Sequence, residues 1–272
     1  MTDSNMTDSN MTDSNMTDSN MTDSDETGID ETGIDETGIA PTAGLPFPGL
    51  PFTVLHICLG NICRSPMAER LLAARFGERL RARGYDGDPT ELLRSHSAGT
   101  GDWHVGDSMN PGSALQLANR GVSPHDFRAR QLARSLLRES QLVLTATAGQ
   151  ALGVSQLEAS LVGRVFPLLR FGRVSREVLP GILSRPGHGM TLSDVRACGE
   201  ALIRSVAGRL TTEEQQLPTD DLTDPFGESD LVFSQIADEI EYAIEPLVSA
   251  LAGAAATEGA RGRTTFSFGE RG

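Results

Sequence analysis

The sequence predicts a single α/β domain of three layers, with a central four-stranded parallel sheet and helices on both of its faces. Two observations predict this fold. The chain contains short β-rich apolar runs, and these alternate with longer segments whose apolar residues recur every three or four positions. Such alternation is typical of parallel strands joined by helices. The predicted strands cover residues 52–57, 92–97, 142–145 and 165–169. The predicted helices cover residues 66–83, 111–120, 130–138, 192–210 and 230–251.

The residues before Phe52 have the composition of a tail. Residues 1–25 are five copies of a unit, Met-Thr-Asp-Ser-Asn, with Asp25 closing the last, and residues 26–40 are three copies of Glu-Thr-Gly-Ile-Asp/Ala. A period of five turns each Met by about 140° on a helix, so no apolar stripe forms. A tolerated repeat expansion explains these repeats more simply than an acidic tether. The predicted organisation is a disordered acidic tail at 1–40, a Pro-rich linker at 41–51, a domain at 52–254 with an inserted or extended segment at about 170–217, and a flexible tail at 255–272.

Charge and composition argue against several classes of partner. The net charge is -14, and the first 40 residues carry 11 acidic residues and no basic one, which leaves -3 for the rest. A nearly neutral domain behind an acidic tail does not favour nucleic acid or an anionic membrane surface. Three cysteines are too few for a disulfide framework, and no apolar run approaches the roughly 20 residues of a membrane span. We expect a cytoplasmic protein without a cofactor.

The most informative segment is 58–66, Cys-Leu-Gly-Asn-Ile-Cys-Arg-Ser-Pro, between the first predicted strand and the first predicted helix. A loop in this position can aim its backbone N–H groups at a phosphate. It lacks the Gly-Lys-Ser/Thr of nucleotide-binding loops. Amide dipoles and a guanidinium favour a thiolate, so Cys58 is a candidate nucleophile. Arg64 can bind two phosphate oxygens with its planar fork, and Ser65 can donate a hydrogen bond to the sulfur.

This segment resembles the signature loop of the low-molecular-weight protein tyrosine phosphatases: a Cys, five residues, then Arg and Ser, with Asn-Ile-Cys inside. The resemblance extends from about Phe52 to Leu251. Two further motifs support it. Ser97-Ala98-Gly99-Thr100 is followed by Trp103, and Asp224-Pro225-Phe226 resembles the family's general-acid loop.

The resemblance implies a two-step reaction on tyrosine-phosphorylated proteins, without a metal. Cys58 would attack phosphorus, Asp224 would protonate the departing phenolate, and water would then hydrolyse the phosphocysteine. Asp220 and Asp221 compete for the acid role, but only Asp224 precedes a proline that keeps its backbone extended. The implied phosphate-binding and substrate-binding residues are Leu59, Gly60, Asn61, Ile62, Cys63, Ser65, Trp103 and Phe226.

Several of these residues have more specific implied roles. Leu59, Trp103 and Phe226 would form apolar walls around a phenyl ring, although Trp103 could instead pack as a lid. Ile62 favours phosphotyrosine, because related phosphatases that act on phosphoarginine tend to carry Thr there. Asn61 and Ser97 would brace the loop. Cys63 would form a reversible disulfide with Cys58, or would simply fill the loop's interior.

The sequence departs from the family pattern at two places. Phe127 stands where many members carry a His that secures the signature-loop Asn, so we expect the network to be incomplete or rebuilt, with His125 as a candidate substitute. Segment 170–217 is longer than usual and rich in Arg. It could form a basic lobe that selects acidic phosphopeptides or covers the site, although a solvated helix face is the commoner explanation. We expect Cys198 to be a core residue, and His56, His96, His104 and His188 to be structural or exposed.

Two alternative functions remain at this level. An arsenate reductase-like enzyme would use the same loop, but it needs a resolving cysteine pair, and only Cys198 lies outside the loop. A catalytically inactive phosphoprotein-binding module is conceivable because of Phe127. The presence of Cys58, Arg64 and Asp224 argues against it.

Overall fold

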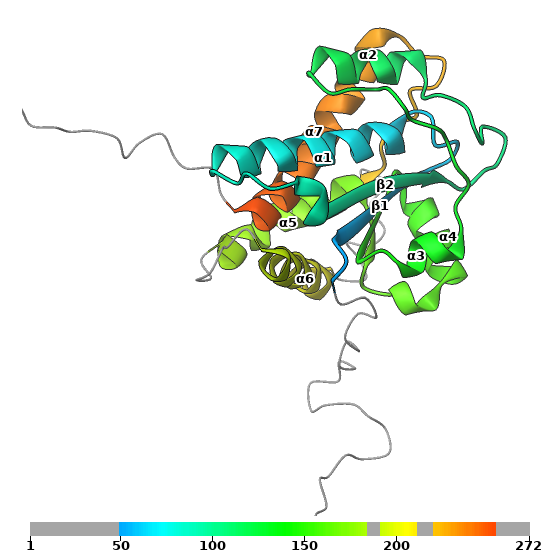
Figure 1. Cartoon of the computed structure of the whole chain (residues 1–272). Coiled ribbons are helices and arrows are strands. Elements are labelled where there is room, and N and C mark those ends of the chain that lie inside the picture. Colours follow the sequence, from blue (N-terminus) through cyan, green and yellow to red (C-terminus); the bar gives the residue numbers. More distant parts are fainter. Residues whose placement is uncertain (1–48, 184–190, 211–219, 254–272) are drawn as a thin grey trace, which may run out of the picture. The chain divides into compact units, whose positions relative to one another are not determined.

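The computed structural model describes residues 49–183, 191–210 and 220–253 (Figure 1). The tails predicted at 1–40 and 255–272, His188 and all but the last residues of the predicted linker lie outside these ranges. The central sheet has four parallel strands, as predicted, and their order is β2-β1-β3-β4. The strands are β1 (Phe52–Cys58), β2 (Leu93–Gly99), β3 (Leu142–Thr145) and β4 (Val165–Pro167).

The strand order places the candidate loop at a crevice of the sheet. From β1 the chain goes to β2 on one side, and then crosses to β3 on the other side of β1. Cys58 is in register with Gly99, and its neighbour Ile57 with Thr145, so the three strands end at the same edge. Open α/β sheets bind ligands at this edge, where the direction of the strand order reverses.

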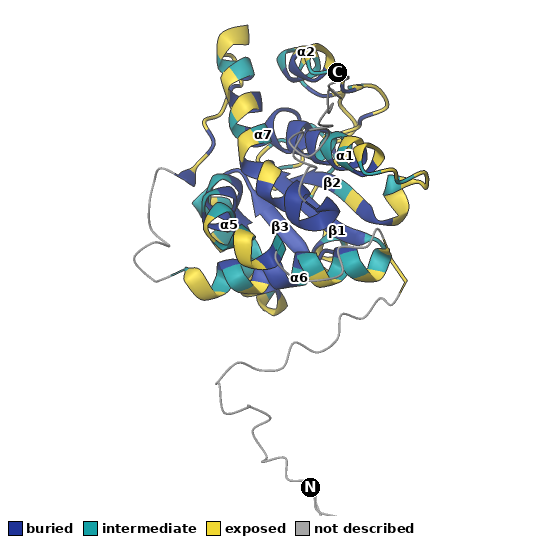
Figure 2. Ribbon diagram, turned by 90° about the vertical axis from the view of Figure 1, so that its left-hand side faces the viewer, coloured by how far each residue is buried: buried dark blue, intermediate teal, exposed yellow. Residues whose placement is uncertain are grey.

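Helices cover both faces of the sheet, because alternate residues of β1 point to opposite faces. Val54 and Cys58 belong to a large apolar core, whereas Leu55 and Ile57 belong to a smaller one. The helices of the large core are α1 (Arg64–Ala82), α2 (Pro111–Asn119), α5 (Leu168–Leu183), α6 (Leu192–Arg209) and α7 (Asp230–Ala252). The smaller core lies beneath α3 (Arg134–Arg138) and α4 (Ala148–Leu157). Figure 2 shows the buried strands enclosed between these layers.

Helix α1 forms where the apolar spacing predicts it. Its predicted face, Met67, Leu71, Leu72, Phe76 and Leu80, is buried in the large core. The helix begins two residues earlier than predicted, so its first turn contains the arginine and serine of the candidate loop. None of the helices in the described ranges is long and apolar enough to span a bilayer.

The prediction misses both α4 and α5. The signal for α4 is a capping box, in which the Thr147 hydroxyl accepts from the N–H of Gln150 and the Gln150 side chain accepts from the N–H of Thr147. Helix α5 follows β4 directly, so the strand predicted to reach residue 169 ends at Pro167. The described part of the predicted insertion is therefore largely core helix: a Cβ on Gly172 would lie 2.5 Å from the Ala243 carbonyl oxygen of α7.

Two other predictions are corrected. The helix predicted from residue 130 begins only at Arg134, because the chain before it pairs with the end of β2: Gly99 N–H donates to Arg130 O, and Leu132 N–H donates to Gly99 O. Cys198 is partly buried rather than a core residue. It lies beside Gly199, whose Cα faces the Phe52 ring so closely that any Cβ would collide with it.

Two histidines are buried in the sheet. Nε2 of His56 pairs with Ser95 Oγ at 3.2 Å, and Nε2 of His96 pairs with Ser140 Oγ at the same distance. Both Nδ1 atoms are buried without a hydrogen-bond partner within the described ranges. Burial, followed by the charge of His96, lowers the pKa of His56 to about 3. Burial, followed by Arg94 and Arg130, lowers the pKa of His96 to about 4.

These two histidines predict acid lability. Because both native pKa values lie below the unfolded value of about 6.5, the native state binds about two protons fewer near pH 5. Their contribution is fully present above pH 6.5 and is lost as the pH falls, with a slope approaching about 2.7 kcal/mol per pH unit near pH 5. Urea unfolding between pH 5 and 7 measures this slope.

The double variant His56→Asn/His96→Asn should lose this part of the slope, and each single variant about half of it. His125→Asn, at an exposed histidine, is the matched control and should keep the wild-type slope. Equal slopes in wild type and double variant would contradict the assignment.

Candidate active site

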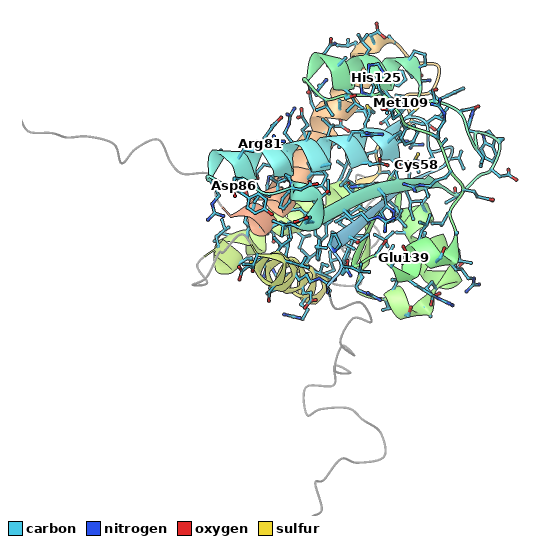
Figure 3. All side chains as sticks on the ribbon, viewed as in Figure 1. Cys58, Arg81, Asp86, Met109, His125 and Glu139 are labelled. Carbon is cyan, nitrogen blue, oxygen red and sulfur yellow. The ribbon has the colours of Figure 1, made fainter. Side chains whose placement is uncertain are left out.

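The loop 58–65 joins the end of β1 to the start of α1 (Figure 3). Cys58 is the last residue of the strand and is buried. Because α1 begins at Arg64, the backbone N–H groups of Arg64 and Ser65 lie in the first turn, where a helix offers them no acceptor. Such N–H groups and the helix dipole favour a bound anion. The start of α1 within the loop is compatible with phosphate binding, which stays a prediction.

Two backbone features fix the shape of this loop. Asn61 has φ of 55°, in the left-handed region that Asn tolerates better than most residues. Gly99, at the end of β2, lies against the loop: a Cβ there would sit 2.8 Å from the Leu59 carbonyl oxygen and 3.1 Å from the Asn61 nitrogen. The N–H of Thr100 also donates to Cys58 O at 3.0 Å. The loop thus rests directly on the backbone that follows β2, and only glycine fits at the contact.

A chain of hydrogen bonds runs through the loop to the thiol. The Asn61 amide donates to Ser65 Oγ at 2.9 Å and to Ser97 Oγ at 2.8 Å. Ser97 Oγ donates its own proton to Glu69 Oε2 at 2.6 Å. Ser65 Oγ lies 3.0 Å from Cys58 Sγ and, because it already accepts from Asn61, its proton is available to the sulfur. Asn61 and Ser97 therefore occupy the bracing positions expected of them.

The bracing network does not use His125. The side-chain oxygen of Asn61 accepts from the backbone N–H of Arg130 at 2.9 Å, which fixes the orientation of the amide. His125 is exposed, and Phe127 is buried in the large apolar core. The prediction that His125 substitutes for the missing histidine is therefore wrong, because the backbone N–H of Arg130 holds Asn61.

Glu69 and Arg130 also belong to this network, and the motif analysis missed both. The Arg130 Nε donates to Ser97 O at 2.7 Å, so Arg130 holds β2 as well as Asn61. Burial raises the pKa of Glu69. The hydrogen bond from Ser97 and the charge of Arg70 partly offset this rise. In the sequence, Glu69 is an ordinary helical acid, and only its position one turn after Ser65 indicates that it faces the loop.

Arg64 connects the loop to the segment that carries the candidate acid. Its side chain is only 7% exposed; Nη2 lies 2.8 Å from Asp224 Oδ2, and Nη1 donates to Leu222 O at 3.0 Å. Its Nε is buried without a hydrogen-bond partner in the described residues. Leu222 N–H in turn donates to Ala146 O, just beyond β3.

The three candidate acids have different surroundings. Asp224 is 49% exposed and contacts Arg64. Asp220 is buried and pairs with Arg173, and Asp221 accepts from the N–H of Ala148 at 2.6 Å. Both competitors are therefore engaged in holding the chain, and Asp224 is the carboxylate that reaches the loop.

Exposed apolar side chains gather near the loop. Leu59, Trp103 and Phe226 are 44%, 60% and 62% exposed. His104 lies between the two aromatic rings, with centroids 6.3 Å from Trp103 and 6.4 Å from Phe226. The backbone of Leu59 lies next to the segment that carries Trp103, because its carbonyl accepts from Gly101 N–H, two residues before Trp103. These side chains form an apolar rim with a polar histidine in it.

His104 is a residue whose place the sequence does not reveal. Its Nδ1 pairs with Asp107 Oδ2 at 2.9 Å. Its Cδ2 would lie 2.9 Å from a Cβ at Gly60, so the ring packs on the loop and a side chain at Gly60 would displace it. The expectation that His104 is merely structural or exposed omits this contact with the candidate site.

Ile62 and Cys63 point inward. Both are buried in the large core, and Ile62 O accepts from Asn110 N–H at 2.8 Å. Burial raises the pKa of Cys63 to about 12, and negative charge on Cys58 and then Asp224 adds to this effect. A thiol held neutral is a poor nucleophile, which favours the space-filling role of Cys63 over the redox role.

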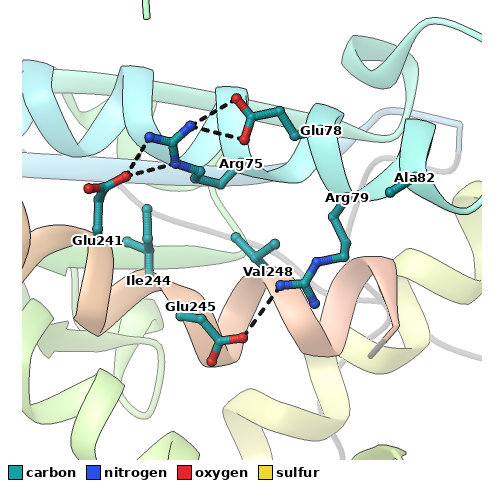
Figure 4. A pocket seen from close by; sticks show the side chains of 8 residues that line it. All are labelled: Arg75, Glu78, Arg79, Ala82, Glu241, Ile244, Glu245 and Val248. Carbon is teal, nitrogen blue, oxygen red and sulfur yellow. Dashed lines mark hydrogen bonds and ion pairs between the residues drawn. The ribbon is translucent and has the colours of Figure 1, made fainter. Parts of the chain in front are cut away.

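A second concave surface lies away from this loop. A groove of about 410 Å³ runs between α1 and α7 (Figure 4). Its charged side chains neutralise one another: Arg75 pairs with Glu78 and Glu241, and Arg79 with Glu245. The groove therefore presents no cluster of one charge sign for a charged ligand. No group of His, Cys, Asp and Glu suited to hold a metal occurs in the part of the chain that the structure describes.

The structure is an α/β domain in which a buried thiol, an arginine and a carboxylate come together at the loop between β1 and α1. Residues 53–182 match the family described as Low molecular weight phosphotyrosine protein phosphatase. Over these residues the chain is similar to that family.

Two curated relatives and one solved structure illustrate the similarity. The chain is 36% identical over 94 residues to the low molecular weight protein-tyrosine-phosphatase of Streptomyces coelicolor, covering 35% of this chain and 52% of the relative. It is 44% identical over 80 residues to low molecular weight protein-tyrosine phosphatase A of Mycobacterium bovis, covering 29% and 44%. The chain thus spans about half the length of the curated relatives it matches. The Erwinia amylovora tyrosine phosphatase amsI superposes with a TM-score of 0.48 at 24% identity, covering 76% of this chain and 98% of that one.

The raised pKa of Cys63 predicts that its thiol resists alkylation. In a Cys58→Ser variant, which leaves Cys63 as the loop's only thiol, iodoacetamide at pH 8 should modify Cys63 at least about tenfold more slowly than the same protein unfolded in urea, because both burial and the neutral thiol oppose reaction. Mass spectrometry of peptides over time measures this rate. Partly buried Cys198 is the internal control and should react faster; equal native rates for the two cysteines would contradict the prediction.

Proposed function

We propose that this protein is a phosphotyrosine-protein phosphatase that hydrolyses phosphate monoesters through a phosphocysteine intermediate. The observation that carries the proposal is the contact of Arg64 with Asp224 at 2.8 Å, which brings the loop of Cys58 and a carboxylate from a distant part of the chain to one guanidinium. The match of residues 53–182 to the low molecular weight phosphotyrosine protein phosphatase family supports it. The proposed substrates are tyrosine-phosphorylated proteins, and the proposed catalytic domain is residues 52–254.

In the first step, the thiolate of Cys58 attacks phosphorus. The S–P bond forms as the P–O bond to the tyrosyl oxygen breaks, and the bonding electron pair leaves with that oxygen, to which Asp224 gives a proton. Arg64 and the loop N–H groups stabilise the charge on the equatorial phosphate oxygens. To do so, the guanidinium must exchange part of its contact with Asp224 for the phosphate, which leaves that carboxyl group beside the leaving oxygen.

In the second step, a water molecule attacks the phosphocysteine. Asp224, now a carboxylate, takes a proton from this water as the O–P bond forms and the S–P bond breaks. Cys58 leaves as a thiolate and inorganic phosphate is released. Ser65, with Oγ 3.0 Å from the sulfur, donates a hydrogen bond that stabilises the departing thiolate.

The rim of the site supports an aromatic substrate. Leu59, Trp103 and Phe226 expose apolar surface beside the loop, and a phenyl ring would cover more of it than the short side chain of phosphoserine. Ile62 is the residue that favours phosphotyrosine over phosphoarginine by resemblance. Because its side chain is buried in the core, it would act through the shape of the loop.

The alternatives have weaker support. Cys198 neighbours Gly199, which packs on Phe52 at the amino end of β1, whereas Cys58 is at the carboxyl end, about 20 Å away along the strand. It is therefore poorly placed to resolve a bond on Cys58, as an arsenate reductase would require. A binding module would not need Asp224 at Arg64. We also propose a cytoplasmic location, because a thiolate nucleophile requires a reducing compartment.

The mechanism predicts separable effects of three substitutions on hydrolysis of phosphotyrosine peptides without added metal. Cys58→Ser should abolish turnover while the protein still binds the peptide, because the phosphate loop remains. Asp224→Asn should lower kcat/KM by about 100-fold or more, the usual contribution of a general acid. Glu228→Gln, at a neighbouring exposed carboxylate, is the control and should keep wild-type activity.

Substrate class is tested with matched peptides that carry phosphotyrosine, phosphoserine or phosphoarginine, and with arsenate. Selective turnover of phosphotyrosine supports the proposal. An inactive wild type that binds phosphopeptide as well as Cys58→Ser does would replace it with the binding module, and arsenate reduction would replace it with the reductase.

A further inference from the structure

We propose that Asp220 is a positioning residue: held by Arg170 and Arg173 of α5, it fixes the segment that presents Asp224 to the loop. The inference rests on the proposed function, since it assigns a role to the support of the proposed acid. It concerns residues outside the signature loop and outside the Asp-Pro-Phe motif.

The contacts of Asp220 are those of a buried anchor. Its side chain is only 6% exposed, and Arg173 reaches it with Nη2 at 3.1 Å from Oδ2 and with Nε at 3.4 Å from Oδ1. Arg170, which is itself buried, approaches Oδ2 with its Nε at 3.9 Å. Removing one partner from such a cluster leaves a buried charge uncompensated, so the three groups hold one another in place.

Both arginines belong to a helix that is packed closely against α7. Helix α5 packs on α7 with backbone contact, since Gly172 lies directly against Ala243. Gly172 sits between Arg170 and Arg173 in the sequence, so both arginines lie next to a close backbone contact of the two helices. Phe171, also between them, is fully buried in the large core.

The segment from Asp220 to Asp224 is short and fixed at successive points. After Asp220, Asp221 accepts from the first N–H of α4, and Leu222 is hydrogen-bonded through N–H to Ala146 and through its carbonyl to Arg64. Four residues extend at most about 14 Å, so Asp220 anchors the chain close to Asp224 and acts together with the contacts of Asp221 and Leu222. A misplacement of about 1 Å can cost about 100-fold in rate.

The inference changes the role of the Arg-rich segment. Arg176 stacks over the Tyr242 ring at 3.4 Å, and Arg209 pairs with Glu177 at 3.2 Å. These arginines, like the two at Asp220, therefore bind other parts of the same chain. In the described residues, α5 therefore supports the segment that carries Asp224 by binding Asp220. This role differs both from a substrate-selecting basic lobe and from a solvated helix face.

The test compares wild type, Asp220→Asn and Arg173→Gln with a matched control, Glu177→Gln, which breaks another acid–arginine pair of α5. The readout is kcat/KM for phenyl phosphate and for 4-nitrophenyl phosphate, since only the poor phenol leaving group depends strongly on protonation by Asp224. Both test variants should lose at least about tenfold more activity on phenyl phosphate than on 4-nitrophenyl phosphate. Inhibition by inorganic phosphate should stay within about twofold, because the loop of Cys58 is untouched.

Thermal unfolding identifies variants that do not fold. Arg173 is 40% exposed, so Arg173→Gln keeps the test valid if Asp220→Asn does not fold. Equal losses on both substrates, or weakened phosphate inhibition, would overturn the positioning role and leave the proposed function standing. If the wild-type protein, with its cysteines kept reduced, hydrolyses neither ester, the proposed function is overturned and this inference with it. Partial recovery of the substrate ratio in Asp220→Glu would support the charge contact as the cause.

Discussion

The arrangement of the candidate site depends on one guanidinium. Arg64 is fixed by its place in the first turn of α1, and it holds both the backbone of Leu222 and the carboxylate of Asp224. Two segments at opposite ends of the fold's chain order meet at this side chain. Because a guanidinium is planar and presents several donors in fixed directions, it can bind two groups at once, which a lysine ammonium on a flexible stem could not do with the same geometry.

A second constraint is the direction of the hydrogen bonds around Asn61. Arg130 N–H fixes the amide's oxygen, so the amide nitrogen must face the two serines. Each serine can then donate one hydrogen bond through its hydroxyl proton, and Ser97 donates to Glu69. The proton of Ser65 is available to Cys58. A histidine is unnecessary in this scheme, because the main chain supplies the donor that orients the amide, and Phe127 is free to fill the core instead.

The sequence predicts the sheet, α1 and the loop because each has a local signal. Strands and α1 follow from apolar period, and Cys58, Arg64 and Asp224 follow from motifs in which spacing and residue type are both constrained. The partners of Asn61 are less visible, because a backbone N–H carries no residue identity. Helix α5 is obscured by its arginines, which suggest a solvated segment until Gly172 and Phe171 are seen to be buried against α7.

The same local signals explain why the acid segment is the hardest part to predict. Asp220, Asp221 and Asp224 are chemically alike in the sequence, and only their partners distinguish them: α5 holds the first, the N-terminus of α4 holds the second, and the loop's arginine meets the third. Those partners come from three elements that are distant in the chain. Asp220 and Asp221 bind elements outside the loop, and Asp224 alone of the three contacts Arg64. The proposed acid role of Asp224 therefore rests on tertiary contacts as well as on the motif.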